Sequence, residues 1–465
     1  MPDSPGPLPN TRYPPRMAAP ASAEPGRRAS TLGIWELAWP AILGNLLHST
    51  VGIVDMKIVG SLGPAAVAAT GTGNRIFFVL QAVLMAVTAG TTALVARAWG
   101  AGDRQEAERV TRASLWLCAS VSLLLSVPAF VFADQLAAVF RLEAETVALA
   151  ATFIRWISPF NVVFAVFFVI SAGLRAAGDT RTPLWIGAGT NVVNVFLVYS
   201  LVYGEFGFPA MGVAGAALAN GLAFSFGAIV TVCLWLGNRL ILGVGPPVCL
   251  ERPRVKRLLR IGYPAGLEQG VWQGGFILFL WIVALYGTEP YAAYMLGVNI
   301  LSFSFVVGFG FSIAASTLVG QHLGAGDPDA AARSGWRAMG MSVGVMLVFA
   351  AIILLAAEPL ARFLIDDDEV VRLTVVFIYV LGSVQALMAI EFSLGGALRG
   401  AGDTRFPLIT VLSGLFGARI LLAGIFAWRG LPVEWIFAAL IADYIVKATM
   451  LTLRFRSGRW KTVIA

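Results

Sequence analysis

Charged residues are scarce in this sequence. Asp, Glu, Lys and Arg make up 13% of the 465 residues and hydrophobic residues 58%, whereas about a quarter of an ordinary soluble domain is charged. The mean hydropathy is +0.80. Apolar runs long enough to cross a bilayer recur along the whole chain and leave no segment for a separate soluble domain. Lipid, rather than water, is therefore expected to solvate most of the protein.

Residues that build metal sites and disulfides are also few. There are two His and three Cys, and Cys118, Cys233 and Cys249 have spacings that fit neither a metal site nor a disulfide framework. With no nucleophile motif and no nucleotide-binding loop, an integral membrane enzyme is disfavoured, and we expect no cofactor. The net charge of +7 does not indicate nucleic acid as a partner, because the Arg residues cluster in short connections without interleaved stacking aromatics.

Twelve apolar segments have the length of a membrane-spanning helix. They cover residues 33–60, 70–97, 112–133, 146–173, 183–203, 211–237, 259–286, 291–320, 337–357, 370–397, 406–428 and 433–453. The predicted fold class is thus an all-α integral membrane protein, with one six-helix lobe over residues 31–238, a cytoplasmic inter-lobe linker over 239–258 and a second lobe over 259–455. Residues 456–465 are expected to form a cytoplasmic tail.

The first 30 residues are rich in Pro, Ala and Arg and contain no apolar core of signal-peptide length. We expect them to form a disordered cytoplasmic tail, and Met17 is a second plausible start of translation.

The distribution of Lys and Arg predicts the orientation of the chain. Connections on one side of the expected membrane carry 24 basic residues, and those on the other side carry four, namely Arg141, Arg362, Arg372 and Arg429. Basic residues concentrate on the cytoplasmic side of membrane proteins. We therefore expect both termini in the cytoplasm of a bacterial cell and the spans in its inner membrane.

Three landmarks recur at one displacement of 224 residues. Pro40 and Pro264 each lie in the first helix of a half, the sequence GAGD occurs at 100–103 and 324–327, and LRAAGDTR at 174–181 matches LRGAGDTR at 398–405. Six spans in each half make the halves parallel, so they should be related by a pseudo-two-fold axis along the membrane normal, with a cleft between them. The turns themselves suit helix ends, where Gly adopts positive φ and Asp, Thr or Pro begins the next helix.

Taken together, these motifs resemble the multidrug and toxic compound extrusion (MATE) family, in particular its DinF-like branch. The resemblance covers about residues 33–455 and includes, besides the repeated turns, the Pro40 helix leading to Val54, Asp55 and the sequence VGSLG at 59–63. It implies a two-lobed antiporter that expels amphipathic, often cationic small molecules in exchange for H+ or Na+. Pro40 and Pro264 are candidate structural hinges, and the protein is expected to be a monomer in contact with membrane lipids.

Asp55 is the leading candidate for the coupling site. It lies about two-thirds along the first span, and Lys57, the nearest basic residue, should face the opposite side of the helix. A carboxylate isolated in an apolar helix favours its protonated form and is a functional candidate by default. Asn191 and Asn194 lie one turn apart on the fifth span and offer amide groups to Asp55 or to a cation. Interhelical hydrogen bonding is the alternative role of these Asn side chains.

Family members similar to this chain place these Asn residues near the Asp of the first helix. Many of them also carry an acidic residue one turn further on, where this sequence has Val198. The missing acid favours H+ over Na+ as the coupling ion without excluding Na+. His48, two turns before Asp55, could relay protons or could be a neutral, hydrogen-bonded side chain.

In the second half, Glu268, the adjoining Gln269 and Glu391 are candidates for a substrate or second cation site. Glu268 lies near the start of its span, so it could also be a solvated residue at a helix end, whereas Glu391 lies deeper. Asp443 and Lys447 are four residues apart on the last helix and should pair with each other.

Aromatic and Met side chains suit flat amphipathic cations and are expected to line the cleft. The candidates are Phe77, Phe78, Gln81, Met85, Phe305 and Phe309. A flippase for lipids or lipid-linked precursors is the alternative function on the same two-lobed fold. A cleft rich in Arg would favour it, but only Arg75, Arg155 and Arg419 lie near span interiors.

Overall fold

The computed structural model describes residues 33–245 and 251–463, and within these residues the chain is helical without strands. The predictions for residues 1–30 and for Cys249 therefore lie outside the described residues. Cys118 and Cys233 are both free. Eleven of the described helices are long and apolar enough to cross a membrane, and a bent pair brings the number to twelve. The prediction of an all-α membrane protein is confirmed.

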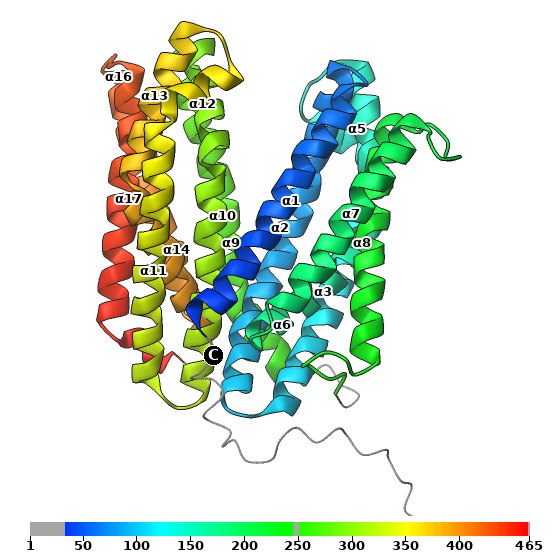
Figure 1. Ribbon diagram of the computed structural model, residues 1–465, viewed down its shortest axis with the longest axis vertical. Coiled ribbons are helices and arrows are strands. Elements are labelled where there is room, and N and C mark those ends of the chain that lie inside the picture. Colours follow the sequence, from blue (N-terminus) through cyan, green and yellow to red (C-terminus); the bar gives the residue numbers. More distant parts are fainter. Residues whose placement is uncertain (1–32, 246–250, 464–465) are drawn as a thin grey trace, which may run out of the picture.

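The helices form two bundles, one from each half of the sequence (Figure 1). The first contains α1 (Ile34–Gly60), α2 (Pro64–Gly100), α3 (Arg104–Val131), α4 (Ala133–Ala138), α5 (Ala144–Ile157), η1 (Ser158–Phe160), α6 (Asn161–Ala176), α7 (Arg181–Tyr203) and α8 (Gly212–Leu236). We call this bundle the N-lobe. Its interior is aromatic, with Phe164 stacked on Phe224 at a ring separation of 4.0 Å.

The second bundle, the C-lobe, repeats this order. It contains α9 (Arg252–Ala284), α10 (Thr288–Gly324), α11 (Pro328–Leu355), α12 (Ala357–Leu364), α13 (Asp368–Ser383), α14 (Gln385–Gly400), α15 (Arg405–Gly414), η2 (Leu415–Ile420), α16 (Leu421–Trp428) and α17 (Val433–Arg456), followed by η3 (Arg459–Thr462). The short helices α4 and α12 begin 224 residues apart, as the landmarks of the sequence do. The repeat in the sequence is thus a repeat of structure.

The fourth span of each lobe is broken rather than straight. In the N-lobe α5 and α6 are joined by the 3-10 turn η1, and in the C-lobe α13 and α14 meet at a bend of 50°. The sequence predicted single continuous segments here, because hydropathy measures the apolar length of a span and not the direction of its axis. A broken span leaves backbone groups without helical partners, and neighbouring helices can satisfy them.

The turns at 100–103 and 324–327 have the structural role that their composition predicts. Gly102 and Gly326 both have φ of +77°, a conformation that favours glycine. The Asp that follows each Gly caps the next helix: Asp103 accepts a hydrogen bond from the Glu106 amide at 2.9 Å, and Asp327 accepts one from the Ala330 amide at 2.7 Å. We call the end of the molecule with these two turns the GAGD end and the opposite end the far end.

At the GAGD end the two lobes are in close contact. A Cβ on Gly100 would collide with the carbonyl oxygen of Gln321, and a Cβ on Gly324 would collide with that of Arg97. These two contacts are related by the 224-residue displacement, so the pseudo-two-fold axis passes between α2 and α10 here. The Gln321 amide also donates to the carbonyl oxygen of Ala176 at 2.8 Å, across the lobes. The small residues of this end therefore hold the lobes together.

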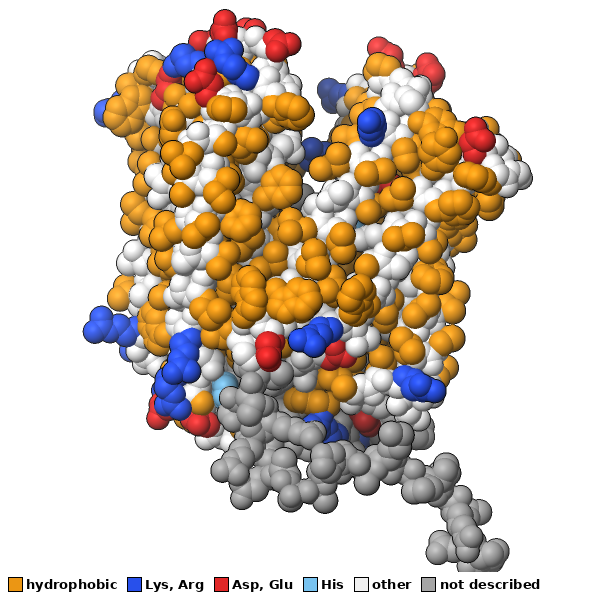
Figure 2. All heavy atoms as spheres, viewed as in Figure 1, with side chains coloured by type: hydrophobic (Ala, Val, Ile, Leu, Met, Phe, Trp, Pro, Cys, Tyr) orange, Lys and Arg blue, Asp and Glu red, His pale blue; other side chains and the backbone are white. Residues whose placement is uncertain are grey.

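At the far end the lobes separate. Figure 1 shows the two bundles diverging away from the GAGD end, and the space-filling view in Figure 2 shows a hollow between them that opens at the far end. The predicted cleft between two lobes is present and is closed at one end only. The outer sides of both bundles in Figure 2 are covered with hydrophobic side chains over most of their length, with charged side chains gathered at the two ends.

Candidate coupling and substrate site

Asp55 lies in an internal cavity of the N-lobe. The cavity has a volume of about 230 Å³ and is lined by α1, α2, α7 and α8. Asn194 of α7 donates a hydrogen bond from Nδ2 to Asp55 Oδ2 at 2.9 Å. The second carboxylate oxygen, Oδ1, is buried and has no hydrogen-bond partner among the described residues. A buried oxygen without a partner is costly, so this atom is a position where a proton or a cation would be stabilised.

The surroundings of Asp55 are polar but uncharged. Asn220 of α8 interacts with its carboxylate, and Asn74 and Thr70 of α2 line the same cavity. No ion pair to Asp55 occurs within the described residues, and Lys57 is exposed on another face of α1. Amide and hydroxyl groups can hydrogen-bond a carboxyl group in either protonation state. The cavity therefore accommodates both a charged and a neutral Asp55.

Asn191 and His48 lie on the side of this cavity toward the GAGD end. His48 interacts with Asn191, and both residues also line a neighbouring cavity of about 180 Å³ that reaches Pro40 and Arg175. His48 is thus placed between two cavities of the N-lobe. This position suits a proton relay, but a hydrogen-bonded structural His would have the same contacts, so both predicted roles stay open.

Sequence analysis did not identify Asn220 as part of this site. Its signal was available, because Asn220 is the single Asn within the otherwise apolar helix α8, and polar residues inside a span are rarely accidental. Periodicity alone could not show that α8 faces α1. By contrast, Val198 is fully buried in the hydrophobic core of the N-lobe.

The C-lobe contains a cluster of buried charges. Lys447 Nζ lies 3.2 Å from Asp443 Oδ1 and 3.2 Å from Glu391 Oε1, and Asp443 also pairs with Arg419. Asp443 is 0% and Lys447 1% exposed. The predicted pairing of Asp443 with Lys447 is confirmed, but the pair belongs to a set of two acids and two bases. We call these four residues the C-lobe charge cluster.

Arg419 reaches this cluster because the eleventh span is irregular. Residues Leu415–Ile420 form a turn of π-helix, which adds a residue to one turn and rotates the side chains that follow. The preceding Gly414 makes room for the cluster, since a Cβ there would come within 2.6 Å of Lys447 Cγ. Sequence analysis placed Arg419 inside a span without finding its partner, because hydropathy does not predict a π-turn.

Glu268 is paired as well. Its carboxylate accepts a hydrogen bond from Arg399 Nη2 at 2.7 Å, and Arg399 also lies 3.4 Å from the Ser312 hydroxyl. Glu268 is buried, so the alternative of a solvated helix end is wrong: the Arg of the second LRxAGDTR motif neutralises it. Gln269 is half-buried. The roles of Glu268, Gln269 and Glu391 in binding a substrate or cation stay predictions.

The residues predicted to line the cleft occupy different environments. Phe77 packs on Phe164 inside the N-lobe at 4.9 Å, whereas Phe305 and Phe309 both contact Phe392 of α14. Met85 is exposed, Gln81 is buried and Phe78 is half-buried. Helical periodicity could not orient these side chains, and only some of them are directed away from the lobe cores.

The two lobes therefore differ in electrostatics. In the C-lobe the spanning-helix carboxylates Glu268, Glu391 and Asp443 each have a basic partner, and in the N-lobe Asp55 has only neutral partners within the described residues. No group of three or more His, Cys, Asp or Glu that could hold a metal ion occurs in the part of the chain that the structure describes. These features, on a fold of two spanning lobes around a cleft closed at one end, define a membrane transporter.

Comparisons with known proteins agree. The MatE family model matches residues 40–200 and again 264–425. A probable multidrug resistance protein NorM from Thermotoga maritima is 34% identical over 436 residues, covering 92% of each chain. A crystal structure of a MATE protein in complex with MaL6 superposes with a TM-score of 0.86 at 20% identity, covering 94% of this chain and 98% of that one. An outward-facing multidrug resistance MATE transporter superposes with a TM-score of 0.85, also at 20% identity, covering 94% and 97%.

This chain belongs to the MatE family, and each of its two lobes carries one copy of the family's domain. It is a transporter rather than an enzyme. The resemblance that the sequence motifs suggested is confirmed at the level of the family, and the assignment to the DinF-like branch stays a prediction.

Proposed function

We propose that this protein is a multidrug antiporter that exports amphipathic, often cationic compounds and takes up H+ through Asp55. The observation that carries the proposal is the carboxylate of Asp55, which is held by Asn194 in a cavity without a basic partner among the described residues and retains one unpartnered oxygen. The relative from Thermotoga maritima, a probable multidrug resistance protein, supports the substrate class.

The coupling follows from the energetics of a buried carboxylate. The charged form of Asp55 attracts the amide groups of Asn194 and Asn220, whereas the protonated form holds them less strongly. Protonation would thus loosen the contact between α1 and α7 and favour a rearranged N-lobe. A ligand shifts such an equilibrium only through its different affinities for the two states, so substrate and proton need to bind different conformations.

H+ is favoured over Na+ because one carboxylate is present and Val198 stands where a second acid is found in related sequences. A sodium ion prefers several oxygen ligands, and the cavity offers Asp55 together with amide and hydroxyl oxygens. The two ions are separated by experiment: a proton gradient at constant Na+ should drive efflux, and a Na+ gradient at constant pH should not.

The direct test is transport by the purified protein in liposomes. We expect an imposed proton gradient to drive uphill movement of a fluorescent cationic dye. Movement of a fluorescent phospholipid between leaflets without dye transport would instead support the flippase. No contact favours that alternative, because Arg419 and Arg155 are paired with Asp443 and Asp134.

We further propose that the GAGD end faces the cytoplasm of a bacterial cell, so that the cleft opens to the outside. Most of the basic residues in connections gather at this end. Reporter fusions after Gly102, Asp179 and Gly326 should all report the cytoplasm, and a fusion after Gly430 should report the opposite side. A reversed result for any one of them would contradict this topology.

A further inference from the structure

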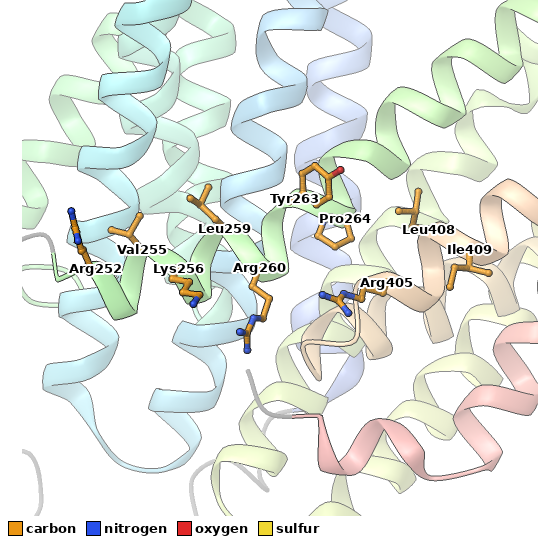
Figure 3. A pocket seen from close by; sticks show the side chains of 10 residues that line it. All are labelled: Arg252, Val255, Lys256, Leu259, Arg260, Tyr263, Pro264, Arg405, Leu408 and Ile409. Atoms are coloured by element: carbon orange, nitrogen blue, oxygen red, sulfur yellow. The ribbon is translucent and has the colours of Figure 1, made fainter.

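A groove with four basic side chains lies at the GAGD end, between the start of α9 and the start of α15. Its volume is about 910 Å³, and its basic residues are Arg252, Lys256, Arg260 and Arg405. Figure 3 shows Arg405 directed toward Arg260, with Tyr263 and Leu408 further up the groove. None of the ten described lining residues is acidic. The groove is thus positively charged at its outer part and apolar at its inner part.

The basic residues of α9 repeat at intervals of four. Arg252, Lys256 and Arg260 therefore lie on one face of the helix, where like charges repel and destabilise it. All three are exposed, and no hydrogen bond or ion pair to another described residue is recorded for them. Arg254, on another face, pairs with Glu106 at 2.8 Å. The unpaired charges are thus confined to the face of α9 that lines the groove.

The repeat of the fold does not require this charge. In the N-lobe the residue 224 positions before Arg260 is Glu36, an acid whose side chain accepts a hydrogen bond from the Gly33 amide at 3.2 Å. The lobes thus differ in charge at corresponding positions. Folding alone gives no reason to gather four cations at one C-lobe groove, and a cationic substrate would be repelled from it.

The inner wall of the groove is apolar and faces outward. Tyr263 is 66% and Ile409 49% exposed, and Leu259 is exposed beside them. All three belong to helices that qualify as membrane spans. Apolar side chains next to a basic cluster at the end of a span match a phospholipid, whose acyl chains lie along the helices and whose phosphate lies at the membrane surface.

We propose that this groove is a binding site for an anionic phospholipid, whose phosphate is held by Arg260 and Arg405 with Lys256 and Arg252 beside them. The lipid would join the first helix of the C-lobe to its fifth span. Because α9 also packs on α2 of the N-lobe, through the close approach of Gly90 to Leu258, a bound lipid would stabilise the conformation that is closed at the GAGD end. This inference does not depend on the proposed transport function.

The test measures lipid binding to the full chain in detergent, by native mass spectrometry with phosphatidylglycerol and phosphatidylcholine. We expect clear preference for phosphatidylglycerol. The double variant Arg260→Gln with Arg405→Gln should bind it roughly twentyfold more weakly, since each cation near a membrane surface contributes about fivefold. The double variant Arg260→Lys with Arg405→Lys should keep most of the binding. Since these side chains are exposed, folding should be unaffected; if it is not, Lys256→Gln alone should lose about fivefold.

The matched control is Arg337→Gln, which removes an exposed charge at the same end outside the groove. We expect it to bind phosphatidylglycerol like the wild type. Equal loss in the control, unchanged binding in the double Gln variant, or equal binding of phosphatidylcholine would overturn the proposal. Displacement of the lipid by an equal concentration of inorganic phosphate would also overturn it and would indicate a site for a soluble phosphate compound.

Discussion

Asp55→Asn should abolish uphill efflux driven by a proton gradient, reducing it to the rate of protein-free liposomes. The substitution keeps the size of the side chain and a hydrogen-bonding group for Asn194, which lies 2.9 Å from the carboxylate, but it removes the only group in the cavity that can alternate between a negative and a neutral form near neutral pH, apart from His48. The measurement is dye efflux from proteoliposomes against a dye gradient.

The control for this variant is Lys57→Gln. Lys57 is close to Asp55 in sequence but exposed on another face of α1, so its loss changes the charge of the helix without changing the cavity. We expect Lys57→Gln to transport at the wild-type rate. If both variants lost transport equally, the effect would belong to the charge of α1 and not to the cavity.

Lys447→Met should destabilise the folded protein by about 3 kcal/mol or more, because removing one partner of a buried ion pair leaves an uncompensated charge. The variant leaves two carboxylates, Asp443 and Glu391, beside one base, Arg419. Glu391→Gln alone should also destabilise, since it leaves two bases beside one acid. Thermal unfolding in detergent, with a ligand-free sample, measures both effects.

The double variant Lys447→Met with Glu391→Gln tests whether the four residues act as one unit. It leaves Arg419 paired with Asp443 and restores the charge balance, so it should be more stable than Lys447→Met alone. Residues that share an ion-pair network show such coupling, whereas distant residues have additive effects. Simple addition of the two losses would show that Glu391 and Lys447 do not depend on each other.

Much of the architecture could be predicted from the sequence, because the features that determine it are long or repeated. Apolar length predicted the spans, and the two GAGD turns together with Pro40 and Pro264 predicted the pseudo-symmetry. The breaks within the fourth spans and the π-turn before Arg419 could not be predicted in this way. They depend on how neighbouring helices pack and satisfy backbone groups, which a hydropathy profile does not contain.

The candidate site was predictable where one residue was anomalous by itself. A lone Asp in an apolar helix stands out in any sequence, and so did the pair of Asn residues on the fifth span. Asn220 and Arg419 were harder, because their importance depends on which helix they face: Asn220 lies against Asp55, and Arg419 pairs with Asp443.

The same positions of the two lobes have different chemistry. Phe279 of α9 occupies the position 224 residues after Asp55, and Ala219 of α8 the position 224 before Asp443. Each lobe thus carries polar groups where the other has apolar ones. The repeat therefore predicted the fold of both lobes, but it could not transfer a site from one to the other.

Proton release on substrate binding tests the central claim most directly. Purified protein in weakly buffered detergent solution, with a pH indicator that does not bind it, is mixed with a cationic substrate of the wild type. If substrate and proton bind different states of Asp55, the wild type should release about one proton per substrate bound, and Asp55→Asn should bind substrate without releasing protons. Release of the same number of protons by a folded Asp55→Asn variant would contradict the account and would place the coupling proton on another group.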